Sequence, residues 1–377
     1  MTLAEREGIW ASERVGRPVS SVGCATDDFS APIAGASTAR AGSLRTAGAS
    51  TGRESARFAG RGVSQAASAA RIARRIAALA CFVVCLIGCA SPRAAQQKFE
   101  YSRLAMGVEA RIVLFAPDED FAVTAAQAAF DEIERLESLF SDWRPDSELS
   151  RLSDRAGTGP VVVSEDLYSI LARAREISAA TDGAFDVTVG PLVALWREAR
   201  RTQALPDAAR LAHAQSLVGW RMLEIDASRR TVALAKPGMR LDLGGIGKGY
   251  AGQGALDVLA ELGCERALVQ MGGDVVCGAP PPDRDGWEID IGGETHLVHD
   301  RAVATSGDKE QHVDIDGVRY SHVVDPRTGL GLTTSSVVTI SAKDGATADA
   351  LATAGSVLTP DRLERVFWLT DARRLSR

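Results

Sequence analysis

The sequence predicts an α/β fold of the α+β type, a single body of mixed or antiparallel sheets with flanking helices. Helical and strand patterns are interspersed between residues 100 and 377 without the strict alternation of a parallel α/β fold. No linker is visible in this stretch, so we expect one unit rather than two. Of the 377 residues, 45% are hydrophobic and 24% charged, which is enough apolar material for a sizeable core.

Each predicted element follows from a local pattern. The alternation of apolar and polar residues predicts a first strand over 103–115. Apolar residues at helical spacing opposite an acidic face predict a helix over 121–140. Ser164, a favourable N-cap residue followed by two acidic residues, begins a second helix that runs through Ala180. The remaining predicted elements are helices over 207–218, 250–262, 346–358 and 361–369, and strands over 222–225, 231–235, 239–243, 267–271, 287–291, 302–305, 320–324 and 337–341.

The N-terminal region differs from this body. Residues 1–70 are rich in Ser, Ala, Gly and Arg without an apolar period, so we expect a disordered leader. In residues 71–88 an Arg cluster precedes thirteen apolar residues, a pattern typical of a signal peptide and too short for a membrane span. A signal so far from the terminus, with no Met between Met1 and Met106, indicates a misassigned start and true initiation at a Val such as Val63.

The signal ends in Leu86-Ile-Gly-Cys-Ala-Ser91, which resembles a bacterial lipoprotein signal. This resemblance implies cleavage before Cys89, acylation of its thiol and a tether over 89–102. The alternative is an ordinary secretory signal that carries a chance Cys. We therefore expect a lipid anchor at the extracytoplasmic face of a bacterial membrane. In the body only Cys264 and Cys277 remain, and we expect small core residues, with a disulfide between them as the alternative.

The charge distribution argues against a nucleic-acid partner. Residues 1–88 carry 11 Arg and 6 acidic residues, whereas residues 89–377 carry 32 Lys and Arg and 43 acidic residues. Because nucleic-acid binding depends on basic surfaces that neutralise phosphates, the acidic body is a poor candidate.

The glycine-rich segment Gly247-Lys-Gly-Tyr-Ala-Gly252 matches the G-x-G-x-x-G pattern between a predicted strand and a predicted helix. Asp242 within the strand, Lys248 within the turn and the lack of a second mononucleotide half count against a Rossmann unit. A Walker A loop is excluded because no Ser or Thr follows Lys248. What remains is a turn that exposes backbone N–H groups beside a cation, which suits an anionic or phosphate-bearing ligand.

Two further patterns offer chemistry. Asp349 and Thr353 are four residues apart and share one helix face, where a carboxylate and a hydroxyl can offer two hard oxygens to Mg²⁺. The alternative is that Asp349 only caps the helix. His322 stands where a predicted strand runs into the Asp325-Pro326 turn, and it is a candidate general base. The alternative is a buried histidine held by a neighbour. The loop 305–308 is either a tight turn or a second oxygen-rich loop.

Seven segments taken together resemble the ApbE family, the FAD:protein FMN transferases, over about residues 103–370. The resemblance implies a single ApbE-like (T-fold-like) body. The segments are 142–150, 181–192, 242–251, 269–274, 305–308, 322–329 and 348–353.

The resemblance implies a reaction in which the pyrophosphate of FAD is cleaved and AMP is released. FMN passes to a Thr or Ser hydroxyl of a target protein through a phosphoester bond, with Mg²⁺ present. The implied partners are FAD and an acceptor protein with a Thr or Ser in a flavinylation motif, a membrane or exported redox protein. One alternative is an FAD pyrophosphatase that gives FMN and AMP. A second is a non-catalytic flavin-binding lipoprotein, which the presence of His322, Asp349, Thr353 and Lys248 disfavours.

The family's functional positions map onto this sequence one by one. The resemblance implies that His322 helps to remove the proton of the acceptor hydroxyl, and that Asp349, Thr353 and a backbone oxygen of Gly245 bind Mg²⁺. The implied FAD contacts are Met106, Trp143, Ala184, Phe185, Asp186, Asp242, Lys248 and Val323. The departures from the family pattern are Val108 for Thr, Trp143 for a common Tyr, Ser153 for Asn, and Gly292-Gly293-Glu294 for an acidic-Pro ending.

Overall fold

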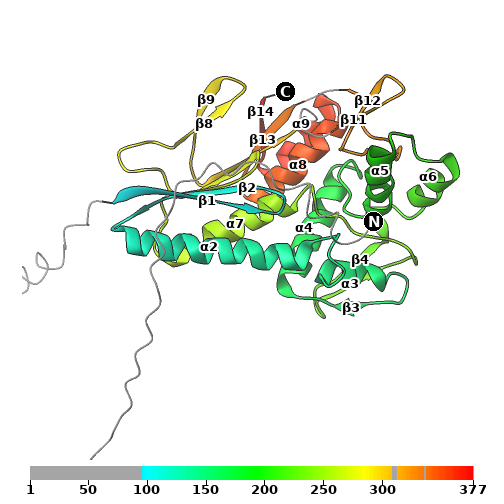
Figure 1. Ribbon diagram of the computed structural model, residues 1–377, viewed down its shortest axis with the longest axis horizontal. Helices are drawn as coiled ribbons and strands as arrows, with labels where there is room; N and C mark the ends of the chain where they lie inside the picture. Colours follow the sequence, from blue (N-terminus) through cyan, green and yellow to red (C-terminus); the bar gives the residue numbers. More distant parts are fainter. Residues whose placement is uncertain (1–95, 308–311, 335–336, 377) are drawn as a thin grey trace, which may run out of the picture. The chain divides into compact units, whose positions relative to one another are not determined.

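Figure 1 shows the computed structural model of the chain, which describes residues 96–307, 312–334 and 337–376. The predicted leader (1–70), the signal segment (71–88) and Cys89 lie outside the described residues, as does Asp308. Among the residues that are described, no helix combines the length and the apolar character that a membrane span requires.

The elements of the body are mostly short and mixed in type along the chain. The helices are α2 (Glu119–Phe140), α3 (Glu148–Asp154), α4 (Glu165–Ala180), α5 (Gly190–Thr202), α6 (Ala208–Gln215), the 3₁₀ turn η3 (Trp220–Met222), α7 (Gly247–Glu261), α8 (Gly345–Val357) and α9 (Pro360–Thr370). The strands are β1 (Gln97–Ala105), β2 (Val108–Ala116), β3 (Val161–Val162), β4 (Leu223–Asp226), β5 (Thr231–Leu234), β6 (Ala267–Met271), β7 (Asp274–Cys277), β8 (Trp287–Ile291), β9 (Glu294–Val298), β10 (Arg301–Ser306), β11 (His312–Ile315), β12 (Val318–Ser321), β13 (Val338–Ala342) and β14 (Arg373–Ser376).

The central element is a seven-stranded sheet with the order β1-β2-β6-β7-β10-β13-β14, in which every neighbouring pair is antiparallel. Three smaller sheets, β3-β5-β4, β8-β9 and β11-β12, are also antiparallel. This arrangement confirms the predicted fold class and differs from the parallel sheet of a Rossmann unit.

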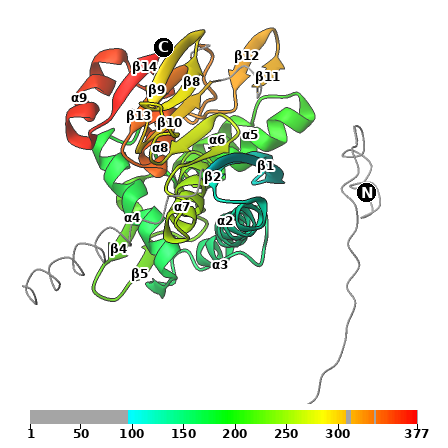
Figure 2. The ribbon, with the colours of Figure 1, turned by 90° about the vertical axis from the view of Figure 1, so that its left-hand side faces the viewer.

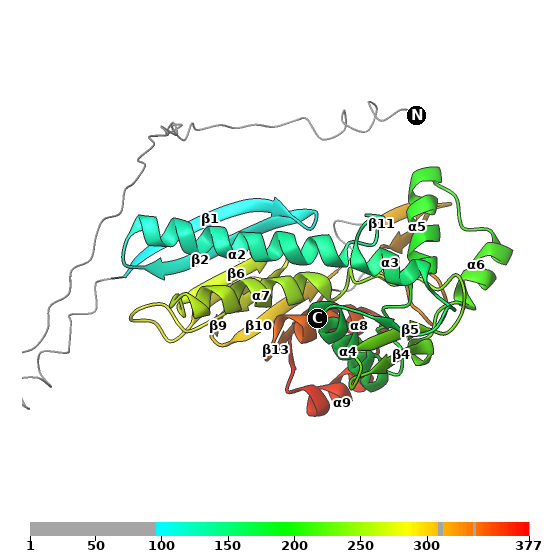
Figure 3. The same ribbon diagram turned by 90° about the horizontal axis from the view of Figure 1, so that it is seen from below.

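The two faces of the central sheet are covered differently. Helices α2 and α7 lie side by side along one face, with α8 beside them (Figures 2 and 3). Ile112 and Leu114 on β2 are fully buried in the core cluster on that side. Val113 between them belongs to a separate cluster with Trp287, which comes from the β8–β9 hairpin over the other face. The alternation along one strand therefore supplies both cores.

Several helices begin at a side-chain cap, and the one predicted from the sequence, Ser164, is confirmed. Ser164 caps α4 by accepting a hydrogen bond from the backbone N–H of Leu167 (3.2 Å). Asp207 caps α6, and Asp344 caps α8 in the same way. Helix α5 is not predicted from the sequence, although a Pro in its first turn is a favourable helix start.

The predicted strand over 103–115 is wrong in extent, because this region is a hairpin. Strands β1 and β2 are joined by Met106 and Gly107, which both have positive φ angles (51° and 75°). Such two-residue turns match the twist of paired strands, but a Met at the first turn position gives no sequence signal. Residues 97–102, predicted as tether, therefore belong to β1 and pair with β2.

The predicted strand over 239–243 is also wrong. The backbone N–H of Leu241 donates to Ser153 Oγ (3.2 Å), and that of Asp242 donates to Val187 O (2.8 Å). A single bridge, Val189–Arg240, is the only strand-like pairing recorded for this segment. The apolar residues are buried as predicted, but loops rather than a ladder satisfy the backbone. The predicted strand 320–324 ends early, since β12 stops at Ser321.

Helices α7 and α8 cross at two glycines. A Cβ at Gly249 would lie 2.0 Å from the carbonyl oxygen of Gly345, and a Cβ at Gly345 would lie 2.0 Å from the carbonyl oxygen of Gly249. Because both obstacles are backbone atoms, neither can move aside without separating the helices. Helix α7 also starts at Gly247 rather than at the predicted 250, so the glycine turn forms its first turn.

We expect Gly249→Ala to lower the free energy of unfolding in urea by about 3 kcal/mol, the upper part of the range for overpacked cores. Gly254→Ala on the same helix is the matched control, because its Cβ would meet only side-chain atoms of Leu136 and Glu132, at 3.1 Å or more. Equal unfolding curves for the two variants would contradict the importance of the crossing.

Candidate active site

The first turn of α7 receives its cap from another helix. The residue before it, Ile246, offers no side-chain hydrogen bond to the free N–H groups of the turn. The backbone N–H of Gly249 instead donates to Asp349 Oδ2 on α8 (3.2 Å). The close crossing of the helices thus places a carboxylate at the positive end of α7.

Lys248 lies between two buried carboxylates. Its Nζ is 3.1 Å from Asp274 Oδ2 and 3.3 Å from Asp349 Oδ2, and it donates weakly to the carbonyl of Gly244 (3.4 Å). Asp274 and Asp349 are 4% exposed. Burial alone would lower the pKa of Lys248, but Asp349 and Asp274 outweigh it and raise that pKa, so the ammonium stays charged. Burial, and then the nearby Asp349, raise the pKa of Asp274.

Gly245 and Thr353 form a small cradle beside this cluster. A Cβ at Gly245 would lie 2.9 Å from Thr353 Oγ1 and 3.4 Å from the ring of Phe185. The Thr353 hydroxyl makes no hydrogen bond within the described part of the chain. Only a glycine therefore allows the backbone at position 245 to approach this hydroxyl. Asp349 lies one helical turn before Thr353 on α8.

This donor set fits Mg²⁺. Carboxylate, hydroxyl and backbone carbonyl oxygens are the ligands that this ion accepts. In 96–307, 312–334 and 337–376 no three His, Cys, Asp or Glu side chains gather as a metal site. The three predicted ligands Asp349, Thr353 and Gly245 are brought together, and Asp274 adds an oxygen, Oδ2, that lacks a well-aligned hydrogen bond.

Asp242 is held by an arginine. Arg197 on α5 donates to Asp242 Oδ2 (3.2 Å) and also to the carboxylate of Asp142. Burial, and then the charge of Asp142, raise the pKa of Asp242. Trp143 follows Asp142 directly and is 71% exposed. The indole is therefore free of the core and available as a stacking surface.

Met106 reaches the same region from the β1–β2 hairpin. Its methyl carbon lies 3.6 Å from the place where a Cβ at Gly247 would be. Its backbone N–H donates to Glu137 Oε2 (3.0 Å), which fixes the hairpin tip to the end of α2. The tip therefore lies over the first turn of α7.

Residues 184–186 line the other side of the cradle. Ala184 and Phe185 are buried, with Phe185 against Gly245. The carboxylate of Asp186 accepts hydrogen bonds from the N–H and hydroxyl of Thr188 (2.8 and 2.7 Å) and from the N–H of Trp220 (2.7 Å). Both of its oxygens are thus used to hold the loop.

His322 stands on a separate segment, directly after β12. Its side chain is exposed, so the alternative of a buried histidine is wrong. Val323 beside it is buried. The turn that follows is rigid, because Asp325 accepts hydrogen bonds from the backbone and the guanidinium of Arg327, each 2.9 Å long.

Two residues of the site are not predicted from the sequence. Asp274 is the last residue of the segment 269–274, one of the seven that resemble the ApbE family. The signal that could identify it is a lone carboxylate in an apolar hairpin. Arg197 gives no signal, since the helix that carries it is not predicted. Cys264 and Cys277 are free and buried in different core clusters, which confirms them as core residues.

Comparison with known proteins agrees with this geometry. The ApbE family model matches residues 106–371. A relative named FAD:protein FMN transferase from Treponema pallidum is 33% identical over 295 residues, covering 72% of this chain and 82% of its own. Another of that name from Klebsiella pneumoniae is 33% identical over 240 residues, 62% of this chain and 74% of its own. The solved flavin transferase ApbE from Vibrio cholerae superposes with a TM-score of 0.66 at 30% identity, covering 74% of this chain and 93% of its own. The chain belongs to the ApbE family.

Proposed function

We propose that this protein transfers FMN from FAD to a Thr or Ser hydroxyl of an acceptor protein, with Mg²⁺ as cofactor and AMP as the leaving group. The observation that carries the proposal is the buried Lys248–Asp349–Asp274 cluster beside the Gly245–Thr353 cradle at the start of α7. It occurs in a chain whose relatives at 33% identity are named FAD:protein FMN transferases.

The start of α7 suits the pyrophosphate of FAD. The positive end of the helix attracts phosphate oxygens, and Lys248 adds a permanent charge. Asp349, Thr353 and the backbone oxygen of Gly245 would hold Mg²⁺, which supplies charge neutralisation on the transferred phosphoryl group. Met106 and Trp143 supply apolar and aromatic surface for the flavin.

His322 is suited to activate the acceptor because it is exposed, as a residue that meets another protein must be. The acceptor hydroxyl oxygen forms a bond to the FMN phosphorus while the bond from that phosphorus to AMP breaks. The hydroxyl proton passes to the His322 imidazole, and AMP leaves with the bridging oxygen. The same exposure admits water, so hydrolysis of FAD to FMN and AMP is the second candidate function.

We also propose that Cys89 is acylated and anchors the enzyme at the extracytoplasmic face of a bacterial membrane, where a membrane or exported redox protein is the acceptor. The support is the segment 86–91, which contains Cys89 and resembles the end of a bacterial lipoprotein signal.

We expect His322→Ala to slow the transfer of FMN by roughly 10²- to 10⁴-fold, the usual contribution of a general base. The full-length protein is incubated with FAD, Mg²⁺ and an acceptor domain that carries a Thr, and the acceptor is followed by intact mass and in-gel flavin fluorescence. FAD affinity stays unchanged, and His213→Ala, on the exposed surface of α6, serves as the control. Transfer at the normal rate by the His322 variant would overturn the assigned role.

Thr353→Val removes one oxygen while it preserves the shape of the side chain. We expect the Mg²⁺ concentration for half-maximal rate to rise at least about tenfold, the effect seen even for groups that only support a metal ligand. Thr202→Val, an exposed helical threonine on α5, leaves the Mg²⁺ dependence unchanged. An identical Mg²⁺ titration for both variants would remove Thr353 from the ligand set.

Cys89→Ser is expected to abolish incorporation of labelled palmitate and to move the protein from the membrane fraction to the soluble fraction, because the acylated thiol is gone. Cys81→Ser, within the same signal, keeps both properties. Membrane retention and labelling of the Cys89 variant would exclude the lipid anchor.

A further inference from the structure

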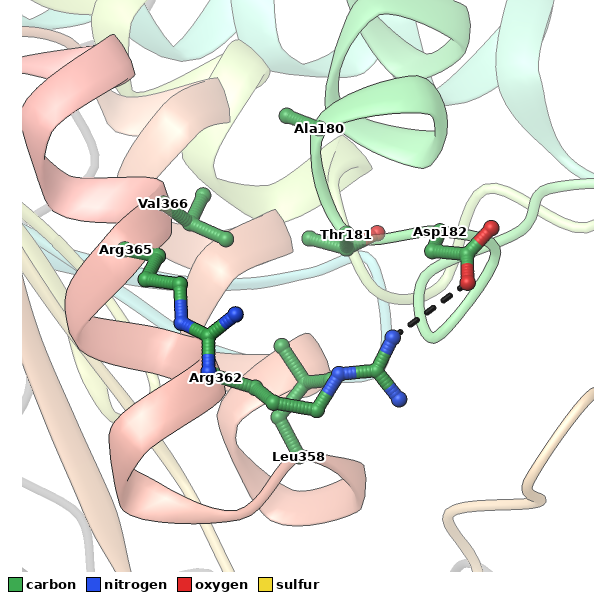
Figure 4. A pocket seen from close by; sticks show the side chains of 7 residues that line it. All are labelled: Ala180, Thr181, Asp182, Leu358, Arg362, Arg365 and Val366. Atoms are coloured by element: carbon green, nitrogen blue, oxygen red, sulfur yellow. Dashed lines mark hydrogen bonds and ion pairs between the residues drawn. The ribbon is translucent and has the colours of Figure 1, made fainter.

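A cavity of about 180 Å³ lies between the end of α4 and helix α9, apart from the Lys248 cluster. Figure 4 shows that apolar side chains of Ala180, Leu358 and Val366 line it together with the side chains of Arg362 and Arg365. The volume exceeds the roughly 30 Å³ share of a single water several times. A small side chain with a charged end therefore fits the cavity.

The charges around this cavity are unbalanced. Arg362 Nη2 lies 3.3 Å from Asp182 Oδ2, and Arg221 Nη2 lies 3.9 Å from Asp182 Oδ1. Arg365 makes no hydrogen bond or ion pair within the described residues. Arg327 is paired with Asp325 (2.9 Å). We call Arg221, Arg327, Arg362 and Arg365 the arginine cluster.

At the cavity itself two guanidinium groups, those of Arg362 and Arg365, face one carboxylate, that of Asp182. The next acidic residues along α9, Asp361 and Glu364, do not line the cavity. The surplus is positive, although residues 89–377 carry 43 acidic residues against 32 Lys and Arg. An acidic ligand is therefore disfavoured by the net charge of the body and attracted to this place.

The arginine cluster is linked through short stretches of chain to both halves of the active site. Arg327 donates a weak hydrogen bond to the carbonyl of Val357 (3.5 Å), directly before the cavity residue Leu358. His322 is five residues before Arg327, so their Cα atoms are at most about 17 Å apart. Asp182 is three residues before Phe185, which contacts the Gly245 cradle. A protein whose hydroxyl reaches His322 extends over this surface.

We propose that the arginine cluster and its cavity bind an acidic side chain of the acceptor protein, close in sequence to the hydroxyl that receives FMN. The proposal rests on the transfer reaction proposed above. Guanidinium groups bind carboxylates through paired hydrogen bonds, and such charge-assisted bonds are among the stronger polar contacts. The apolar lining residues Ala180, Leu358 and Val366 accommodate the methylene groups of an Asp or Glu side chain.

The test compares two acceptor domains that differ only in having Asp or Asn near the modified Thr. We expect the combined substitutions Arg362→Gln and Arg365→Gln to raise the KM for the Asp acceptor about tenfold, because two charge-assisted contacts are lost. The KM for the Asn acceptor, the kcat and the cleavage of FAD in water stay unchanged. Arg201→Gln, an exposed arginine in the last turn of α5, is the matched control.

A variant of opposite sign makes the test independent of folding defects. Asp182 has a positive φ (52°), a conformation that Asn tolerates, so Asp182→Asn preserves the loop. It releases Arg362 and Arg221 from their carboxylate, and we expect the KM for the Asp acceptor to fall. The KM of the wild-type protein rises with salt for the Asp acceptor more than for the Asn acceptor.

Equal changes of KM for the two acceptors, or no change, would overturn the proposal. A second result would also overturn it: the arginine variant loses binding to vesicles of anionic lipid while its KM for both acceptors stays unchanged. The arginine cluster would then be a membrane contact. If the wild-type protein labels neither acceptor, the transfer proposal fails by itself. In that case the role of the arginine cluster is tested by the binding of a fluorescent peptide that contains Asp but no Ser or Thr. Weaker binding of this peptide by the arginine variant would support the proposal, and equal binding would contradict it.

Discussion

Helices α7 and α8 touch through backbone atoms at Gly249 and Gly345, and the candidate site depends on this contact. At this distance the carboxylate of Asp349 reaches both the backbone N–H of Gly249 in the first turn of α7 and the ammonium of Lys248. One turn further along α8, Thr353 lies against Gly245 for the same reason. A side chain at either glycine of the crossing would push the two helices apart, so that these groups would no longer lie within hydrogen-bond distance of one another.

The buried charges are arranged so that each supports another. Lys248 remains protonated because two carboxylates surround it, and the two carboxylates tolerate each other because Lys248 lies between them. A cluster of this kind costs desolvation energy, which a purely structural contact would not require. Its position at a helix start, beside a Thr353 hydroxyl that makes no hydrogen bond within the described residues, fits the phosphate ligand and the metal ion that we propose.

The acceptor side of the molecule has a different electrostatic character. The proposed pyrophosphate site is a buried cluster of one ammonium and two carboxylates, whereas the arginine cluster is exposed and has surplus positive charge. A small anion is thus bound where water is excluded, and a protein partner is guided where charges remain accessible. The turn over 325–327, rigid through its Asp–Arg contacts, connects the two regions.

The sequence by itself determined the fold class, most helices with their caps, and the motifs from which the ApbE family and the ligands Asp349 and Thr353 were predicted. These features depend on local periodicity and on residues close in the chain. Tertiary structure decided the conformation of residues 239–243 and the Met106–Gly107 turn. In residues 239–243 the backbone N–H groups bond to partners distant in sequence instead of to a strand. At Met106–Gly107 the pairing of β1 with β2 imposes the turn. Asp274, Arg197 and the arginine cluster likewise became visible only in three dimensions. Their charges act through space over a few ångströms, and the chain brings them together from segments that are up to 180 residues apart.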